Sequence, residues 1–296
     1  MDIAIIGMPL NLGCDRDGVE LAPKYLRSEN LLSHLFNRHT PHDLGDLIVP
    51  HRRDIQEAEM VDRMKYIHSI LAVNKELSNT VYNVLHTTNY LPIIIGGDHA
   101  LSWGSIAGVK REYADISVFY IDAHGDFNTA ATSESHNVHG MHMAYLMGFG
   151  DQRYVDFPSP NRKLAPENVF FYGTRSLDAG EVALAKTACL HIRTTQEIQQ
   201  EAIETTCRII EAQLLRLKHI HLSIDLDVLD PKIAPGTGVP EKDGLTLPEL
   251  QAIITTILHS KKVVSIDFVE YNPLLDATKK TESAVCAILS TINNAL

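Results

Sequence analysis

Six short apolar runs, each ending in small or polar residues, give the strongest strand signals along the chain. They consist of nearly continuous Ile, Val, Leu and Phe rather than an alternation of apolar and polar residues. Continuous runs are typical of strands buried on both faces, as in a parallel sheet covered by helices. The predicted strands are Ile3–Gly7, Leu91–Ile95, Ile116–Ile121, Asn168–Tyr172, Ile220–Ile224 and Val263–Phe268.

Helical periodicity fills several of the segments between these strands. In Gln199–Leu217, apolar residues recur at the spacing of one helical face. Another helix is expected to begin after Thr246, which has the right spacing to form a capping box with Glu249. The predicted helices are Ala58–Leu85, Gln199–Leu217, Leu247–Leu258 and a last helix from Thr278 to the C-terminus.

The alternation of strands and helices predicts the fold class. We expect an α/β protein, a three-layer α-β-α sandwich in which helices cover a central, mostly parallel sheet through right-handed crossovers. No Pro-, Gly- or Ser-rich linker divides the alternation, which favours a single domain over residues 1–296. The polar, Pro-containing stretch Asp151–Asn161 is interpreted as an excursion from that domain.

Composition and charge exclude several classes of protein. Hydrophobic residues make up 45% and charged residues 21% of the 296 residues, which is typical of a globular protein. No apolar run reaches the roughly 18 residues of a membrane-spanning helix, and the N-terminus lacks the basic start of a signal peptide. Four widely spaced cysteines fit a reducing, cytoplasmic location. The net charge of −11 disfavours a nucleic-acid partner, and we expect no membrane partner.

Polar residues gather directly after four of the predicted strands. Ligands of open α/β sheets bind at the carboxyl ends of the strands, so this placement itself points to a functional site. The four polar segments are Gly96–His99, Asp122–Asp126, Asp225–Pro231 and Glu270–Pro273.

The spacing of acids in these segments predicts a metal site. Residues two apart in an extended chain point the same way, so both acids and the histidine of Asp122–Asp126 converge, as do the acids of Asp225–Asp227. Four packed carboxylates cannot all stay ionised without a compensating charge, which two divalent cations would supply. A single acid here would be interpreted as a helix or turn cap, but the combination favours metal binding. Oxygen ligands with imidazoles and no thiolate suit Mn²⁺ better than a structural Zn²⁺ site. The predicted ligands are His99, Asp122, His124, Asp126, Asp225 and Asp227.

In these motifs and their order, the sequence resembles the ureohydrolases, the family of arginase, agmatinase and their relatives. The similarity runs from Ile3 to about Ile292. The chain most resembles the bacterial type of arginase, because Asn128–Gly140 is similar to the arginase loop that follows the metal motif. A second similarity, in Gly173–Glu181, is to the arginase segment that holds the substrate's amino group.

The resemblance implies two Mn²⁺ ions per subunit and hydrolysis of L-arginine to L-ornithine and urea by a hydroxide that bridges the two metals. It places two of the acids, Asp122 and Asp225, between the metals. The first metal would be bound by His99, Asp122, Asp126 and Asp225. The second would be bound by Asp122, His124, Asp225 and Asp227.

The resemblance also implies roles around the metals and in assembly. Glu270 would orient the guanidinium, and His139 would pass a proton to the leaving amine, work that suits an unperturbed imidazole pKa near 6.5. Among the substrate contacts, Asn128 and Ser135 would bind the α-carboxylate and Asp178 would face the α-amino group. The expected catalytic residues are His139, Glu270 and Asp126. The expected substrate-binding residues are Asn128, Ser133, Ser135, Asn137, Asp178 and Glu181. The family implies a homo-oligomer, a trimer or a hexamer.

Three positions depart from the arginase pattern, and several functions stay open. Ser133 stands where Thr is frequent, His136 where Gly is common, and Ser176 where many arginases have Asp. An agmatinase, guanidinobutyrase or formiminoglutamase would keep the same metals with a different tail pocket. A non-catalytic metal-binding paralogue would have lost a ligand, His139 or Glu270, and none is lost. A two-metal phosphatase would place Lys or Arg beside the metals, and the motifs carry none.

Overall fold

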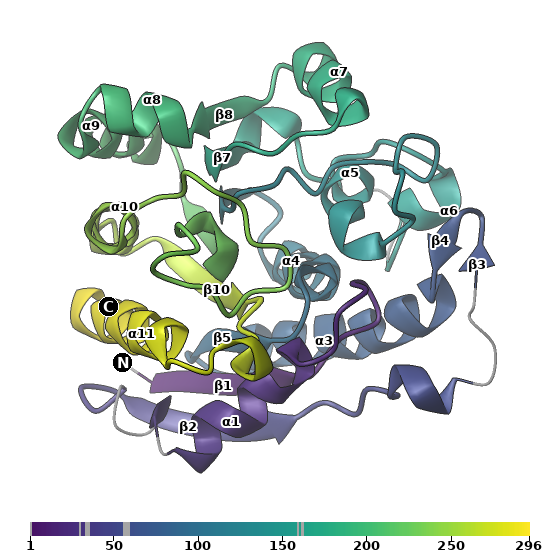
Figure 1. Ribbon diagram of the computed structural model, residues 1–296, viewed down its shortest axis with the longest axis horizontal. Helices are drawn as coiled ribbons and strands as arrows, with labels where there is room; N and C mark the ends of the chain where they lie inside the picture. The colour runs from purple at the N-terminus through teal and green to yellow at the C-terminus, as the bar shows by residue number, and fades with distance from the viewer. Residues whose placement is uncertain (1, 30, 33–35, 56–59, 159, 161–162) are drawn as a thin grey trace.

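An eight-stranded, all-parallel sheet forms the centre of the computed structural model, which describes the chain except for residues 1, 30, 33–35, 56–59, 159 and 161–162 (Figure 1). The strand order is β2-β1-β5-β10-β9-β6-β7-β8. The strands are β1 (Asp2–Met8), β2 (Thr40–Asp46), β5 (Leu91–Gly96), β6 (Ile116–Ile121), β7 (Val169–Thr174), β8 (His191–Thr194), β9 (His219–Asp225) and β10 (Val263–Val269). All neighbouring strands pair in parallel, as their continuous apolar runs predict.

Helices cover both faces of this sheet, which confirms the three-layer α/β prediction. Successive residues of a strand point to opposite faces, so Ile3 and Ile5 of β1 join one hydrophobic core while Ala4 and Ile6 join the other. One layer contains α1 (Ala22–Ser28), α9 (Ile203–Leu214), α10 (Leu247–His259) and α11 (Lys280–Ala295). The opposite layer contains α3 (Ile67–Thr87), α4 (Ser102–Glu112), α5 (His142–Leu146) and α6 (Gln152–Val155) (Figure 1). Two more helices, α7 (Ala179–Ala188) and α8 (Thr195–Gln200), flank the β7–β8 end.

All six predicted strands are present, and two edge strands were missed. The missed strands lack a continuous apolar run because they lie at the two edges of the sheet. β2 has the sequence TPHDLGD and is largely exposed, and β8 has only four residues. The side chains of these two edge strands are exposed or only half-buried, so the strands form without a continuous apolar run. A search for such runs therefore cannot find them.

The predicted helices are present with corrected bounds. The prediction of helix from Ala58 was wrong, because Met60–Val61 (β3) and Met64–Lys65 (β4) form an antiparallel hairpin and α3 begins only at Ile67; Ala58 itself lies outside the described residues. The helix predicted over Gln199–Leu217 is interrupted at Ala202, whose φ is 64°.

The predicted cap before α10 is confirmed, and the excursion contains one short helix. Thr246 forms the predicted capping box with Glu249 and starts α10. Within Asp151–Asn161, the described residues contribute α6 and no strand of the sheet, and Asn161 lies outside the described part of the chain. No helix among the described residues combines the length and the apolar character that crossing a membrane requires.

The topology brings the predicted polar segments together. The chain passes from β5 to β6, and β9 and β10 are later inserted between them. All four strands run in the same direction, so their carboxyl ends meet at the middle of one edge of the sheet. This is the position at which ligands of open parallel sheets bind.

Candidate metal centre and substrate cavity

Short capped turns fix the polar side chains at the four central strand ends. After β5, the side chain of Asp98 accepts hydrogen bonds from the backbone N–H groups of Gly13, at 2.8 Å, and Ala100, at 3.0 Å. At the end of β9, Asp225 accepts a bond of 2.8 Å from the N–H of Asp227. Asp98 therefore braces the turn that carries His99, while the acids of β9 are held two residues apart on the same turn.

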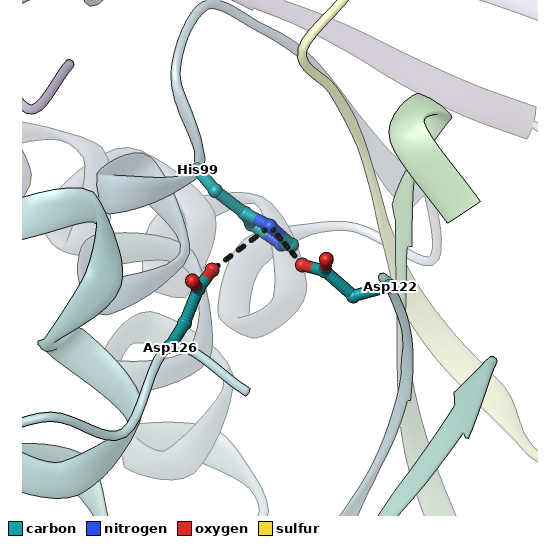
Figure 2. A group of neighbouring side chains, drawn as sticks. All are labelled: His99, Asp122 and Asp126. Carbon is teal, nitrogen blue, oxygen red and sulfur yellow. Dashed lines mark ion pairs between the residues drawn. The ribbon is translucent and has the colours of Figure 1, made fainter. Parts of the chain in front are cut away.

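The first group of candidate ligands surrounds the Nδ1 atom of His99. This atom lies 2.8 Å from Oδ2 of Asp122, 3.0 Å from Oδ2 of Asp225 and 3.4 Å from Oδ2 of Asp126. Figure 2 shows His99, Asp122 and Asp126 pointing toward a common centre. Asp126 reaches it from a left-handed backbone conformation with φ 56°. Asp122 and Asp126 therefore converge as their spacing predicts, whereas His124 belongs to a second group.

The second group shares Asp122 with the first. The Nδ1 atom of His124 lies 3.1 Å from Oδ2 of Asp227 and 3.5 Å from Oδ1 of Asp122. Asp122 therefore presents one carboxylate oxygen to each histidine, and the three residues could hold a second ion. Asp122 is thus the residue that the two candidate groups have in common.

Burial makes the cluster suitable for cations. Asp122, Asp225 and Asp227 are all buried, and His99 is buried with them. Burial and the charge of Asp122 raise the pKa of Asp126 to about 7, and burial with the charges of Asp227 and Asp122 raises the pKa of Asp225. Carboxylates that resist ionisation side by side are stabilised by divalent cations. The donor set of carboxylates and imidazoles fits Mn²⁺.

Two residues that the sequence analysis missed connect this cluster to the adjoining loop. The hydroxyl of Tyr120 donates a 2.6 Å hydrogen bond to Oδ2 of Asp126 and lies 3.2 Å from Nε2 of His142. The other ring nitrogen of His142 lies 2.8 Å from the carbonyl oxygen of His139. Tyr120 lies in β6 two residues before Asp122, so its side chain points to the same side of the extended chain. This spacing was the one signal in the sequence that could have placed Tyr120 near the candidate ligands.

A cavity of about 360 Å³ opens over the cluster and brings together all the predicted substrate contacts. Its wall contains five of the six predicted ligands, while Asp122 lies beneath it. The predicted catalytic and substrate-binding residues in the wall are Asp126, Asn128, Ser133, Ser135, Asn137, His139, Asp178, Glu181 and Glu270.

Glu270 and His139 lie together at one side of this cavity. Oε1 of Glu270 accepts a 2.9 Å hydrogen bond from the backbone N–H of His99 and lies 3.6 Å from Nδ1 of His139. Its Oε2 is buried and has no hydrogen-bond partner among the described residues. Burial opposes protonation of His139, but the carboxylate of Glu270 outweighs it and raises the pKa of His139 to about 9. Glu270 thus offers an unused acceptor to a cationic group in the cavity.

Hydrogen bonds order the loop that brings Asn128, Ser133 and Ser135 to the cavity wall. Nδ2 of Asn128 donates to Oδ2 of Asp178 over 2.8 Å, and the hydroxyl of Ser135 accepts a 3.2 Å bond from the N–H of Asn137. The hydroxyl of Ser133 likewise accepts a 3.1 Å bond from the N–H of His136, whose φ of 62° explains why Gly suits this position. Ser133 and Ser135, which were predicted to contact the substrate, therefore also stabilise the loop in which they lie.

Two of the predicted substrate contacts are engaged by the protein itself. The amide of Asn137 donates to Asp15 over 2.9 Å and accepts from Nζ of Lys65 over 2.8 Å. Glu181 accepts the N–H groups of Phe127, at 3.1 Å, and Asp178, at 2.9 Å. These bonds assign loop-supporting contacts to Asn137 and Glu181.

The structure also adds Glu241, which sequence reasoning missed, to the cavity wall. Its Oε1 accepts a 3.4 Å hydrogen bond from the hydroxyl of Ser176 and lies 3.8 Å from Nε2 of His124. An acid therefore stands beside Ser176, one of the positions that departs from the arginase pattern. It lies in the loop that follows Asp225–Pro231, outside the motif itself, so the motif gave no signal for it.

Comparisons with known proteins agree with this geometry. The sequence model described as the arginase family matches residues 1–293. The arginase of Bacillus subtilis (strain 168) is 35% identical over 295 residues, covering 98% of this chain and 97% of the relative. The crystal structure of arginase from Bacillus cereus superposes with a TM-score of 0.91 at 30% identity, covering 99% of this chain and 98% of the other.

A third relative was solved with a bound amino acid. The crystal structure of Entamoeba histolytica arginase, in complex with L-ornithine, has a TM-score of 0.89 at 29% identity and covers 98% of each chain. Similarity of this kind extends over the whole length of the protein, including all four polar strand ends. The chain therefore belongs to the arginase family.

Proposed function

We propose that this protein is a metal-dependent amidinohydrolase that cleaves the guanidinium group of L-arginine and yields L-ornithine and urea. The observation that carries the proposal is the position of Asp122, which faces His99 with one oxygen and His124 with the other beneath a polar cavity. Bacterial arginases at 35% identity over nearly the whole chain support the same reaction.

Two Mn²⁺ ions are the proposed cofactors. Asp122 and Asp225 are proposed as the bridging ligands, with His99 and Asp126 completing one site and His124 and Asp227 the other. Divalent cations bound there would supply a hydroxide nucleophile near neutral pH, because coordination lowers the pKa of water. Tyr120 orients Asp126 through its 2.6 Å hydrogen bond. The carboxylate of Asp126 is therefore held in position before a cation binds.

Glu270 is proposed to bind and orient the guanidinium. Its Oε1 is tied to the backbone of His99, while Oε2 is buried without a partner among the described residues. A carboxylate held in this way accepts strong, charge-assisted hydrogen bonds from a guanidinium. The same bonds would place the guanidinium carbon over the floor of the cavity.

His139 is proposed to deliver the proton that the departing amine needs. It lies in the cavity wall 3.6 Å from Glu270, and its backbone carbonyl is tied to His142. Imidazole is suited to accept and donate protons at a fixed position near the reacting groups. The carboxylate beside it favours the protonated, donating form.

Asn128, Ser135 and Asp178 in the cavity wall are proposed to recognise the amino-acid end of the substrate. Asn128 and Ser135 provide neutral donors for the α-carboxylate, and Asp178 provides an acceptor for the α-amino group. Ser133, Asn137 and Glu181 support this loop through the bonds described above.

Residues 1–296 are further proposed to act as one domain in a cytoplasmic homo-oligomer, a trimer or a hexamer. The sharing of one sheet by strands from both halves of the chain supports the single domain. The mass in solution, measured by light scattering after size-exclusion chromatography, distinguishes these assemblies from a monomer of 32.9 kDa.

The function is tested by measuring products. Purified protein supplied with Mn²⁺ is expected to release urea and ornithine from L-arginine in equal amounts. Chelation is expected to abolish release, and renewed Mn²⁺ to restore it. Binding of the metal should also raise the melting temperature, because a ligand that binds only the native state stabilises it. A verified metal-free protein with full activity would refute the proposal.

A further inference from the structure

Five polar side chains form a buried cluster within the otherwise apolar interface between α4 and the sheet. None of them belongs to the cavity wall, and each is at most 1% exposed. The members of this buried polar cluster are Ser102, Ser105, His221, Ser223 and Asp267. Burying so many polar groups is costly unless they bond to one another, and such networks specify one arrangement when they do.

The secondary structure explains how the cluster assembles. His221 and Ser223 are two apart on β9 and so share one face, and Asp267 of β10 is the register partner of Ser223. On α4, Ser102 and Ser105 are three residues apart and therefore lie on the same side of the helix. The helix thus lays two hydroxyls over three polar residues of the sheet.

Asp267 is the acceptor at the centre of the cluster. Its Oδ2 accepts a 2.6 Å hydrogen bond from the hydroxyl of Ser102 and another from the hydroxyl of Ser105. Nε2 of His221 lies 3.1 Å from the same oxygen. A fully buried carboxylate is therefore held by three neighbours and has no direct contact with the cavity.

A chain of hydrogen bonds joins this carboxylate to the metal centre. Ser102 Oγ lies 3.5 Å from Ser223 Oγ, which lies 2.8 Å from Nε2 of His99. A carboxylate only accepts, so Ser102 donates its proton to Asp267 and is left to accept from Ser223. Ser223 in turn accepts from the Nε2–H of His99. Every proton in the chain then points toward Asp267.

This polarity has a consequence for the opposite nitrogen of His99. With a proton kept on Nε2, the Nδ1 atom among Asp122, Asp126 and Asp225 would be the nitrogen that gives up its proton and offers its lone pair to a cation bound there. A metal-binding imidazole needs that lone pair, and the partner of its other nitrogen fixes the tautomer and the ring orientation.

We propose that Asp267 is a positioning residue, which acts through Ser102 and Ser223 to hold His99 in the tautomer and orientation that bind a cation. The inference rests on the metal centre of the proposed function. It adds to that centre a chain of hydrogen bonds that begins at a carboxylate on β10, outside the cavity wall and the proposed ligands.

The two serines of α4 provide a matched test. Ser102→Ala and Ser105→Ala each remove a buried hydroxyl from Oδ2 of Asp267, but only Ser102 connects onward to Ser223. The dissociation constant for Mn²⁺, measured by calorimetric titration of chelator-treated protein, is expected to rise about tenfold in Ser102→Ala and to stay at the wild-type value in Ser105→Ala. Ser223→Ala, which removes the direct partner of His99, is expected to weaken binding by about ten- to a hundredfold.

Thermal melting of the metal-free variants separates positioning from folding. Ser102→Ala and Ser105→Ala are expected to lower the melting temperature by similar amounts. Ser102→Thr, which keeps a hydroxyl at this position, should bind Mn²⁺ with the affinity of the wild type. Wild-type affinity in Ser102→Ala, or an equal loss in Ser105→Ala, would overturn the proposed role of this chain of hydrogen bonds while leaving the metal centre intact. A wild type that binds no Mn²⁺ would instead refute the proposed function.

Discussion

Asn128 donates a hydrogen bond from Nδ2 to Oδ2 of Asp178 across 2.8 Å. The family resemblance assigns these residues to different groups of the substrate, Asn128 to the α-carboxylate and Asp178 to the α-amino group. The structure shows that they are coupled. Losing Asn128 would therefore remove the proposed donor for the carboxylate and also release Asp178, the proposed partner of the amine.

This coupling predicts unequal losses for two substrates. Asn128→Ala is expected to lower kcat/KM for L-arginine by about ten- to a hundredfold, because a hydrogen bond to a charged group is worth about 1.5–3 kcal/mol. Agmatine lacks the carboxylate and should lose only severalfold, through the released Asp178. Steady-state kinetics on both substrates measure the difference. Equal losses would show that Asn128 only braces the loop.

A second prediction concerns the two acids that face His124. Asp122 presents an oxygen to each histidine, whereas Asp227 lies beside His124 alone. Asp122→Asn is therefore expected to lose both ions and Asp227→Asn to keep one. Metal analysis of the purified variants by mass spectrometry counts them. Two retained ions in Asp122→Asn would contradict the bridging assignment.

His139 is predicted to affect turnover without affecting metal content. The side chain lies in the cavity wall beside Glu270 and outside the two groups of ligands. His139→Asn is expected to keep two ions and to lose about a hundredfold or more in kcat, the usual contribution of a positioned acid–base group. Metal analysis and kinetics are made on the same preparation. A wild-type kcat would reduce His139 to a structural loop residue.

Glu181 predicts a pH dependence of stability. Burial raises the pKa of its carboxyl to about 7 from an ordinary value of 4.5. A carboxyl with a raised pKa in the folded state contributes its stabilisation below the unfolded pKa and loses it as the pH rises through the folded pKa. The free energy of unfolding of the wild type, relative to Glu181→Gln, is thus expected to fall by about 3 kcal/mol between about pH 4.5 and 7.

Chemical denaturation of both proteins in the presence of a chelator measures this difference without a contribution from metal. Glu181→Gln also replaces one acceptor of a backbone N–H, which lowers its stability by a similar amount at every pH. Only the change with pH therefore reports the ionisation of Glu181. Parallel pH profiles for the two proteins would mean that Glu181 ionises as freely in the folded protein as in the unfolded chain.

The central strands and the metal cluster could be predicted from the sequence because burial and charge leave local patterns. The continuous apolar run Ile116–Ile121 and the acids that follow it are adjacent in sequence, and strand periodicity sets their directions. Parallel pairing then determines that Asp122 and Asp225 meet, although they are far apart along the chain.

The remaining parts depend on contacts that no local pattern encodes. The exposed strand β2 is recognisable only from its pairing with β1. Glu241 reaches the cavity from a loop whose path depends on tertiary packing. Asp267 sits within the apolar run Val263–Phe268, where a single acid shows no partner until α4 and β9 are placed against it.

Substrate preference distinguishes an arginase from the other ureohydrolases that would share the same metal cluster. The measurement is kcat/KM of the Mn²⁺-loaded wild type for urea release from L-arginine, agmatine and guanidinobutyrate, with formamide release followed for formiminoglutamate. The cavity, whose wall contains Asn128 and Asp178 as well as Glu270, predicts that L-arginine is preferred over agmatine by about a hundredfold or more. Faster hydrolysis of agmatine than of L-arginine would contradict the assignment of L-arginine as the substrate.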